Sequence, residues 1–330
     1  MIERSTLASR SSKMQKQLPD IFLFSTSSSS TLTLVSSRNS ILCLKTLNMF
    51  HFPQELDFPT LQWANFIKEN YFYLLLPSAS YLIVINLGQK FMQDRKPLNV
   101  SRVLVWWNLL LTIFSILGTD RMLNEVSTAT EESASFISGI CLPGIRTSRA
   151  GLWFMLFAFS KFFEFGDTFF LVAKKKPVIF LHWYHHITVM LLTFHIWANQ
   201  HPIGRYFTAM NFFVHSFMYG YYTLRALGVK IRSKIALGIT TLQLSQMFIG
   251  LAISLFSLFN CTQHPNSSAY FALFIYSTYA ILFGKFLYES YFSRKKSVPA
   301  TSIVKTESID INRSKQLMNY EYNNNKIKGA

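Results

Sequence analysis

Seven long apolar stretches, separated by short polar ones, follow one another along the chain from about residue 70 to residue 291. An α-helix needs about 20 apolar residues to cross the hydrocarbon core of a bilayer. The pattern therefore predicts an all-α integral membrane protein built as a bundle of seven transmembrane helices, of which the second is the shortest. The expected spans are residues 71–90, 103–117, 151–172, 178–197, 206–224, 235–259 and 269–291.

The overall composition supports a membrane environment. Half of the 330 residues are hydrophobic, 32 of them are Phe, and only 15% are charged. This is more apolar surface than a soluble globular core of this length is expected to hold. The net charge of +16 does not by itself indicate nucleic-acid binding, because the basic residues are concentrated in alternate loops.

The placement of these basic residues predicts an orientation, since short loops rich in Lys and Arg stay in the cytosol. The loops after the first, third, fifth and seventh spans are strongly basic, whereas the loops between them are nearly neutral or carry one Arg. We expect the N-terminus on the lumenal side and the C-terminus in the cytosol. The basic loop residues are Lys90, Arg95, Lys96 and Arg102; Lys174, Lys175 and Lys176; Arg225, Lys230, Arg232 and Lys234; and Arg294, Lys295 and Lys296.

Two of the three cysteines test this topology. Cys141 and Cys261 fall in loops assigned to the lumenal side, where disulfides form, whereas Cys43 precedes the first span. We expect a Cys141–Cys261 disulfide that ties the loop after the second span to the loop after the sixth. The alternative is two unpaired small residues.

The two ends of the chain differ from its middle. Residues 1–57 are rich in Ser and Thr, are basic, and are expected to be disordered; Met49 is an alternative start, which would make the preceding residues an extension of the gene model. Residues 58–296 form the predicted membrane domain. Residues 297–330 are expected to be a polar cytosolic tail, and its Lys326 and Lys328 have the spacing of a dilysine signal for retrieval to the endoplasmic reticulum.

The fourth span contains three histidines in the stretch FLHWYHHITVM. His182, His185 and His186 are related as i, i+3 and i+4, so their imidazoles project from one helix face. That face is expected to point into the bundle, because buried polar groups without partners are costly in hydrocarbon. Chemistry is one interpretation, and a structural hydrogen-bonded cluster is the other.

The third span contains AFSKFFEFGDTFF. Lys161, Glu164 and Thr168 lie close to one face and Asp167 on the adjacent face. A charged pair in a membrane span is expected to face the interior of the bundle. The set is either a structural ion pair or a group that orients the histidines of the fourth span.

The fifth and sixth spans carry further polar sets, in NFFVHSFMYGYY and ITTLQLSQ. Each set recurs at helical spacing, so each predicts a polar stripe on one helix face; packing and interhelical hydrogen bonds are the alternatives to chemistry. The first set is His215, Met218, Tyr219 and Tyr222, with Tyr221 beside it, and the second is Thr240, Gln243 and Gln246.

A di-iron site, which membrane desaturases and hydroxylases build from histidine boxes, is a possible interpretation of the HxxHH pattern. It requires more imidazole and carboxylate ligands than this chain supplies. Of eight histidines, His51, His201 and His264 lie outside the spans and His195 has no box around it. We expect no metal.

In this order, the four sets resemble the fatty acid elongase family of the endoplasmic reticulum, the ELO/ELOVL condensing enzymes. The resemblance covers about residues 58–296 and departs from the family at Phe165, where Leu is usual. The branch that it suggests acts on saturated and monounsaturated long-chain acyl groups. The matching motifs are KxxExxDT at Lys161, Glu164, Asp167 and Thr168; HxxHH at His182, His185 and His186; HxxMYxYY at His215, Met218, Tyr219, Tyr221 and Tyr222; and TxxQxxQ at Thr240, Gln243 and Gln246.

The resemblance implies a decarboxylative condensation of a long-chain acyl-CoA with malonyl-CoA to 3-ketoacyl-CoA, without a cofactor. An apolar tunnel would hold the acyl chain, and basic residues at the cytosolic mouth would attract CoA. Expected partners are the reductases and the dehydratase that complete two-carbon elongation, and homo- or hetero-oligomers are possible. The basic residues assigned to this mouth are Lys174, Lys175, Lys176, Arg232 and Lys234.

We assign His185 as the nucleophile that accepts the acyl group and His215 as the residue that acts on malonyl-CoA. His182 and His186, with the carboxylates of the third span, would fix orientation and protonation, and the tyrosines and glutamines would hold the thioester. In a competing mechanism the histidines act only as general base and oxyanion donor. A seven-span lipid transporter or receptor remains the non-enzymatic alternative.

Overall fold

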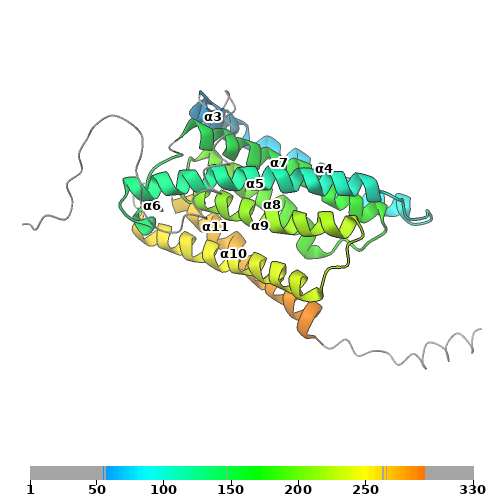
Figure 1. The fold of residues 1–330 in the computed structure, drawn as a ribbon. Helices are drawn as coiled ribbons and strands as arrows, with labels where there is room; N and C mark the ends of the chain where they lie inside the picture. Colours follow the sequence, from blue (N-terminus) through cyan, green and yellow to red (C-terminus); the bar gives the residue numbers. More distant parts are fainter. Residues whose placement is uncertain (1–54, 56, 146, 262–263, 265, 294–330) are drawn as a thin grey trace, which may run out of the picture. The chain divides into compact units, whose positions relative to one another are not determined.

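Every regular element in the described part of the chain is a helix (Figure 1). The computed structural model describes residues 55, 57–145, 147–261, 264 and 266–293. The all-α class is therefore confirmed for these residues. The helices are α3 (Thr60–Asn70), η2 (Tyr71–Leu74), α4 (Leu75–Met92), α5 (Ser101–Glu132), α6 (Phe136–Gly139), α7 (Ser148–Ala173), α8 (Phe180–Ala198), α9 (Ile203–Ala226), α10 (Ser233–Asn260), α11 (Asn266–Leu287) and the π-helix η3 (Tyr288–Phe292).

Several predictions about the chain ends fall outside the described residues. These are the N-terminal extension up to residue 54 with Cys43 and the alternative start Met49, the basic residues 294–296, the polar tail and the retrieval signal at Lys326 and Lys328. The division into domains stays a prediction.

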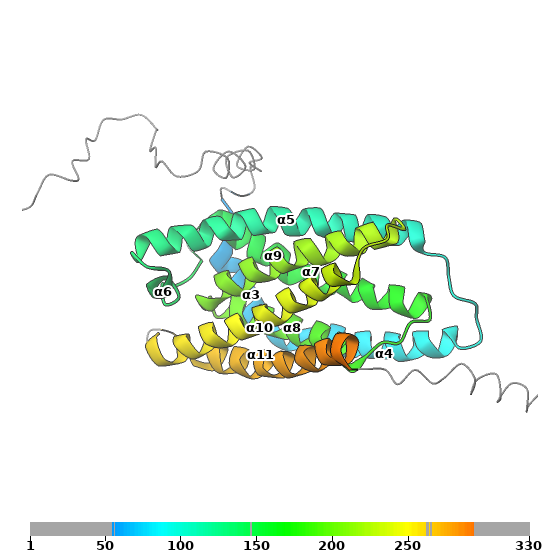
Figure 2. The same cartoon turned by 60° about the horizontal axis from the view of Figure 1, so that its bottom comes forward.

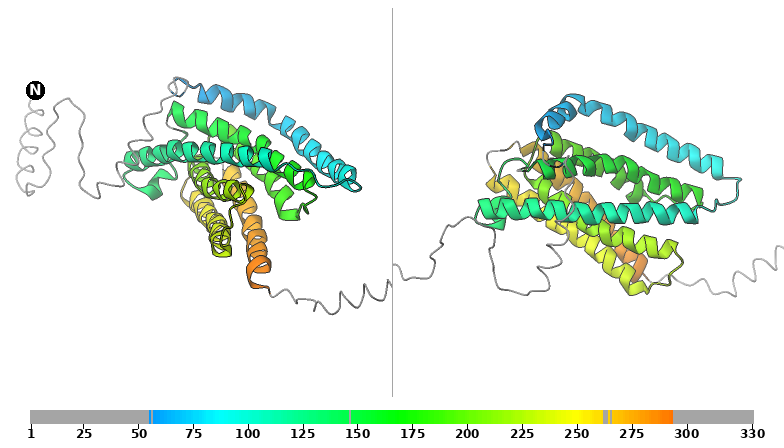
Figure 3. Two further views of the ribbon diagram at one scale, coloured as in Figure 1. Left: turned by 45° about the vertical axis from the view of Figure 1, so that its right-hand side comes forward. Right: turned by 45° about the horizontal axis from the view of Figure 1, so that its top comes forward.

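Six helices contact one another in cyclic order: α5, α7, α8, α11, α10, α9 and back to α5. Figure 2 shows α10 and α11 running side by side along one part of this ring. Helix α4 packs on α7 from outside the ring, as both views of Figure 3 show, and α3 contacts α8. The ring therefore brings together α7, α8, α9 and α10, the four helices that carry the polar motifs.

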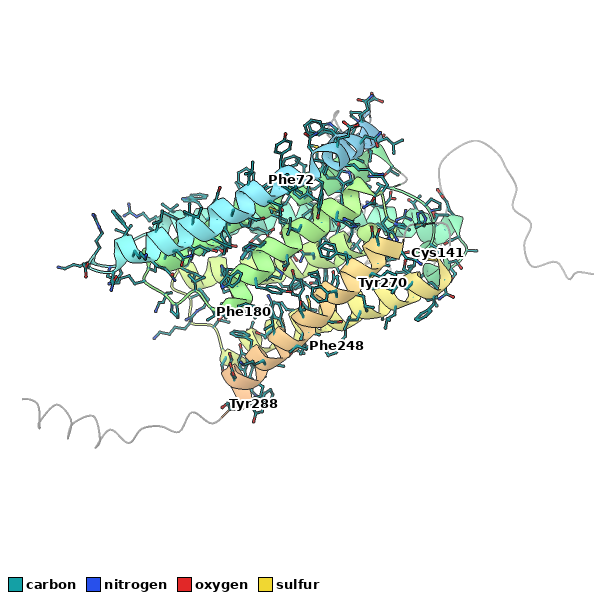
Figure 4. The ribbon with its side chains drawn as sticks, turned by 180° about the vertical axis from the view of Figure 1, so that it is seen from behind. Phe72, Cys141, Phe180, Phe248, Tyr270 and Tyr288 are labelled. Carbon is teal, nitrogen blue, oxygen red and sulfur yellow. A yellow bond between two sulfur atoms is a disulfide. The ribbon has the colours of Figure 1, made fainter. Side chains whose placement is uncertain are left out.

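Four stretches are long and apolar enough to cross a membrane: Thr60–Met92, Ser101–Glu132, Ser233–Asn260 and Asn266–Phe292. Helices α7, α8 and α9 carry the charged and histidine-rich motifs, which lower their hydropathy. The count of seven spans is thus not confirmed by length and composition. Large apolar side chains such as Phe72, Phe248 and Tyr270 are exposed on the outer face (Figure 4), as expected for a protein that contacts lipid.

The second predicted span was too short. Helix α5 has 32 residues and continues well beyond residue 117, so Asp120, Arg121 and Glu125 lie inside a helix and not in a loop. A hydropathy window treats such residues as loop. Here they are buried and paired, with Arg121 Nε 3.0 Å from Glu55 Oε1 and Arg121 also bound to Asp120.

The loops lie at two opposite ends of the helix ring. At one end, Cys141 and Cys261 form a disulfide with a Cα–Cα distance of 5.0 Å, the pairing expected from the sequence. At the other end, Lys175 Nζ donates to the carbonyl oxygens of Gln93 (2.9 Å) and Arg95 (3.1 Å), which joins the loops after α7 and α4. Figure 4 labels Cys141 at the first end and Phe180, which follows the lysines, toward the second. We call these the disulfide end and the lysine end.

Candidate active site

A cavity of about 590 Å³ lies inside the helix ring, and all six ring helices contribute to its wall. Its apolar lining includes Leu104, Phe170, Phe283 and Phe286. Its polar lining draws on each of the four sequence motifs, so residues more than 80 positions apart meet in one space. The motif residues on the wall are Glu164, Asp167, His182, His185, His186, His215, Met218, Tyr219, Tyr222, Gln243 and Gln246.

Lys161 connects the motif of α7 to that of α9. Its ammonium donates to Glu164 Oε1 at 2.8 Å and to Asn211 Oδ1 at 3.0 Å, and the side chain is almost fully buried. Asn211 Nδ2 lies 3.2 Å from His215 Nε2, and His215 Nδ1 lies 3.8 Å from Glu164 Oε1. A buried ammonium needs such partners, and Asn211 connects it to one ring nitrogen of His215, while the other ring nitrogen lies near Glu164 beyond hydrogen-bond distance.

Asp167 is held by neutral donors. Trp107 Nε1 on α5 donates to one carboxylate oxygen at 2.7 Å, and Tyr219 Oη on α9 donates to the other at 2.9 Å. A Cβ at Gly166 would lie 2.6 Å from the Trp107 ring, so only glycine at this position lets the indole approach α7. The carboxylate is thus fixed at the cavity wall by two other helices of the ring.

The histidines of α8 differ in their partners. His182 Nε2 lies 2.8 Å from Thr168 Oγ1, which in turn lies 2.6 Å from Tyr81 Oη on α4. The ring of His186 is 4.5 Å from that of His182 and 5.7 Å from that of His185, between centroids. Among the described residues, the carboxylates of α7 make their hydrogen bonds to α5, α7 and α9, and the contact from α7 to His182 comes from Thr168. We expected carboxylates of α7 to orient these histidines. In the structure, the contact from α7 to His182 is made by the hydroxyl of Thr168.

His185 stands where two cavities meet. A smaller cavity of about 30 Å³ shares His185, Asn211, Gln246 and Met247 with the large one. Beyond His185 its wall is mainly apolar, with residues such as Phe154, Ile196 and Phe207 from three helices. An apolar tunnel was expected from the family resemblance, but the residues that line this space could not be named from the sequence, because they are dispersed among ordinary apolar positions.

Some predicted site residues lie away from the large cavity. Thr240 Oγ1 donates to Ala236 O of its own helix at 3.1 Å, and Lys175 is engaged with the loop after α4. Of the basic residues assigned to the mouth, Lys174 lines the cavity, and Arg225, which sequence reasoning did not assign, lines it too. The predicted site residues not on this wall are Lys161, Thr168, Lys175, Lys176, Tyr221, Arg232, Lys234 and Thr240.

Sequence reasoning also missed partners of the motif residues. Asn211 precedes His215 by one helical turn, and this spacing was a usable signal. Trp107 on α5 and Tyr279 on α11 contact Asp167 and His185 but belong to no motif, and Asn108 on α5 lines the large cavity, where a polar residue in an apolar span was its sole hint. Their relation to the site depends on which helices are neighbours.

Comparison with known proteins gives one consistent result. The family described as "ELO: GNS1/SUR4 family" matches residues 66–299. The chain is 38% identical over 245 residues to "Putative fatty acid elongase 3" of Caenorhabditis elegans, covering 72% of this chain and 77% of that protein. It is 38% identical over 259 residues to "Very long chain fatty acid elongase 3" of Mus musculus, covering 76% and 94%. It is 36% identical over 274 residues to "Very long chain fatty acid elongase 6" of Drosophila melanogaster, covering 78% and 86%.

Proposed function

Because the chain belongs to the ELO (GNS1/SUR4) family, we propose that it is a fatty acid elongase. It condenses a long-chain acyl-CoA with malonyl-CoA to give 3-ketoacyl-CoA, CO2 and free CoA. The single observation that carries this proposal is the meeting of four motifs on the wall of one cavity of about 590 Å³, whose lining also includes apolar side chains such as Leu104, Phe170 and Phe283. A polar centre with an apolar lining suits a thioester joined to an acyl chain.

In the first half of the reaction, a ring nitrogen of His185 attacks the thioester carbon of acyl-CoA. The carbon–sulfur bond breaks, CoA leaves, and the proton from the other ring nitrogen ends on the CoA thiol. The result is an acyl-imidazole, which divides one difficult step into two easier ones. The position of His185 supports this role, because it lies on the wall of the large cavity, where a thioester can reach it, and also borders the small, mainly apolar cavity, which would have to widen to admit the acyl chain.

In the second half, malonyl-CoA loses CO2 and the electron pair of the broken bond remains as a thioester enolate. The enolate carbon attacks the acyl carbon, the bond to His185 breaks, and the departing imidazolate takes up one proton from water, which restores neutral His185. His215 stabilises the enolate. Its contacts with Asn211 (3.2 Å) and Glu164 (3.8 Å) support this role, because they fix the ring before charge develops.

CoA enters at the lysine end. Lys174 and Arg225 line the large cavity, and both are cationic groups that attract the phosphates of CoA. We place this end in the cytosol and the disulfide end in the lumen of the endoplasmic reticulum, with seven spans and the C-terminus in the cytosol. The reductases and the dehydratase of two-carbon elongation are the partner enzymes, because 3-ketoacyl-CoA is an intermediate.

The proposal is tested with the purified full-length chain in detergent, labelled malonyl-CoA and a series of saturated and monounsaturated acyl-CoAs. Wild type is expected to form 3-ketoacyl-CoA, and His185→Ala to lower kcat by about 10³-fold. His195→Ala is the matched control, since His195 lies on the same helix but lines neither cavity. The absence of product from folded wild type with every acyl-CoA would overturn the elongase assignment and favour a transporter or receptor.

The same preparation separates the two mechanisms. A covalent acyl-imidazole gives release of CoA from acyl-CoA before malonyl-CoA is added, together with ping-pong kinetics. General-base chemistry without a covalent stage gives no such release. In either case the His185→Ala loss identifies the histidine box as the reacting centre.

A further inference from the structure

Helix α11 carries none of the four motifs, yet one of its side chains is tied to the backbone of His185. Tyr279 is 2% exposed, and its hydroxyl donates to the carbonyl oxygen of His185 at 3.2 Å. The same hydroxyl lies 2.7 Å from Thr188 Oγ1, one turn further along α8. The phenol therefore contacts α8 at two successive turns around the reacting histidine.

The rings of α11 also pack on the imidazole itself. The centroid of the Tyr279 ring is 4.9 Å from that of His185, with the planes tilted by 45°. Phe283, one helical turn further along α11, has its centroid at 6.1 Å with the planes nearly perpendicular. Two aromatic rings from one neighbouring helix thus flank His185.

This packing matters because of how the other histidines are held. His182 Nε2 contacts Thr168 and His215 Nε2 contacts Asn211, whereas the hydrogen bonds of the described residues include none to a ring nitrogen of His185. A nucleophile needs a free lone pair on its attacking nitrogen. Its orientation must then come from packing, and Tyr279 and Phe283 provide it.

We propose that Tyr279 is a positioning residue for His185, which makes α11 a fifth helix of the active site. This inference rests on the proposed condensation function. By fixing both the backbone carbonyl and the ring of His185, Tyr279 holds the attacking nitrogen at the junction of the two cavities. Misplacement of a reacting group by about 1 Å can cost about 100-fold in rate, so we expect the effect in the rate constant of the acylation step at saturating acyl-CoA.

The test measures the single-turnover rate constant for acyl transfer and, separately, kcat and KM for acyl-CoA. Loss of folded protein lowers the amplitude of a single turnover but not its rate constant, so a merely structural role does not change this readout. We expect Tyr279→Leu, which also alters the wall of the small cavity, to lower the single-turnover rate constant at saturating acyl-CoA by about 10- to 100-fold. Tyr279→Phe, which keeps the ring, is expected to lower it by about threefold.

Thr188→Val removes the hydroxyl partner while leaving the tyrosine. It is expected to lower the single-turnover rate constant by the same factor as Tyr279→Phe. In the double variant the rate constant is expected to fall by less than the product of the two factors, because both changes remove the same contact. Tyr184→Phe is the matched control, because it keeps the ring that packs on the Tyr279 ring at 6.2 Å between centroids and removes only the hydroxyl. Tyr184 Oη donates to Thr278 Oγ1 at 3.0 Å, so it joins α8 to α11 through different atoms from those that hold His185.

The outcomes separate this inference from the proposed function. Absence of 3-ketoacyl-CoA from folded wild type would overturn the condensation and the role of Tyr279 together. Turnover by wild type with an unchanged rate constant in Tyr279→Leu would overturn only the positioning role. A loss in Tyr184→Phe equal to that in Tyr279→Phe would do the same, since it would attribute the effect to the interface between α8 and α11 in general.

Discussion

Two groups of buried charges lie in this protein, and they are built differently. The first, which we call the ionic cluster, lies near the disulfide end and contains three carboxylates and three arginines. The second is the charged part of the active site, where Lys161 stands with Glu164 and Asp167 beside the histidines. The ionic cluster consists of Glu55, Asp120, Arg121, Glu125, Arg149 and Arg205.

In the ionic cluster, charges are matched by opposite charges and backbone groups. Arg121 and Arg149 contact Glu55, at 3.0 Å and 3.1 Å, and Arg205 donates to the carbonyl of Leu142 at 3.0 Å beside the disulfide loop. None of the six residues is among those that line the two cavities. Such an arrangement serves folding, because removing one partner leaves a buried charge uncompensated.

In the candidate active site, one of two carboxylates, Glu164, pairs with the ammonium of Lys161. Asp167 is held by an indole and a phenol in place of a cation, and both carboxylates lie on the cavity wall. Carboxylates in the candidate active site thus face a substrate-sized cavity, whereas carboxylates in the ionic cluster face arginines. The comparison teaches that access to a cavity, and not burial or charge, distinguishes the set of charged residues that we assign to the reaction from the set that serves folding.

The largest expected effect comes from breaking the ionic cluster. Arg121→Met leaves Glu55 and Asp120 without their shared partner, and we expect the free energy of unfolding to fall by about 3 to 5 kcal/mol. The single-turnover rate constant of the remaining folded protein should stay within about twofold. Denaturant unfolding in detergent measures the first quantity.

Arg225→Met is the matched control for that variant. Arg225 lines the cavity at the lysine end, so its loss is expected to raise KM for acyl-CoA and to change stability by less than about 0.5 kcal/mol. An Arg121→Met variant with unchanged stability and a lowered rate constant would contradict the assignment of the ionic cluster to folding.

The disulfide is expected to have the next largest effect. Replacing Cys141 and Cys261 together by Ser frees a closed loop with a sequence separation of 120 residues. In the chain-entropy description this lowers stability by about 2 to 4 kcal/mol, and the rate constant per folded molecule is expected to be unchanged. Thermal unfolding with and without reductant provides the check: reductant should destabilise wild type and leave the double variant unaffected.

A smaller effect, dependent on pH, is expected from His201 in the loop between α8 and α9. Burial, with nearby His264 and His195, lowers the pKa of His201 to about 4, from 6.5 in the unfolded chain. The native state therefore binds fewer protons between these values, so the stability present above pH 6.5 is lost as the pH falls toward 4. His201→Gln is expected to flatten the dependence of Tm on pH between 7.5 and 5, and an unchanged slope would exclude this histidine as its source.

The smallest expected effect comes from filling the small cavity of the candidate active site at Gly204. A Cβ at Gly204 would lie 2.7 Å from Ile196 Cγ2 and 3.0 Å from Phe154 Cε2, at the wall of the small cavity. Gly204→Ala should narrow this space and lower kcat/KM for the longest accepted acyl-CoA by about 3- to 10-fold relative to shorter ones. Gly238→Ala, which meets nothing within 4 Å, is the control. An unchanged chain-length profile would place the acyl end elsewhere.

Local patterns in the sequence predicted much of the fold and of the site. The apolar runs located the helical segments, and helical spacing placed Lys161 and Glu164 where they form an ion pair. The full length of α5 was not predictable from hydropathy, because Asp120, Arg121 and Glu125 resemble loop residues until their partners are known.

What a chain encodes locally is the helix period and the face on which each side chain lies, because backbone hydrogen bonding fixes 3.6 residues per turn. For this reason the motifs of α7 to α10 could be recognised from the sequence. The neighbours of each helix depend on contacts between residues far apart in the chain. Only the tertiary structure could therefore pair Asp167 with Trp107, bring Tyr279 to His185 and separate the charges that face a cavity from those that face one another.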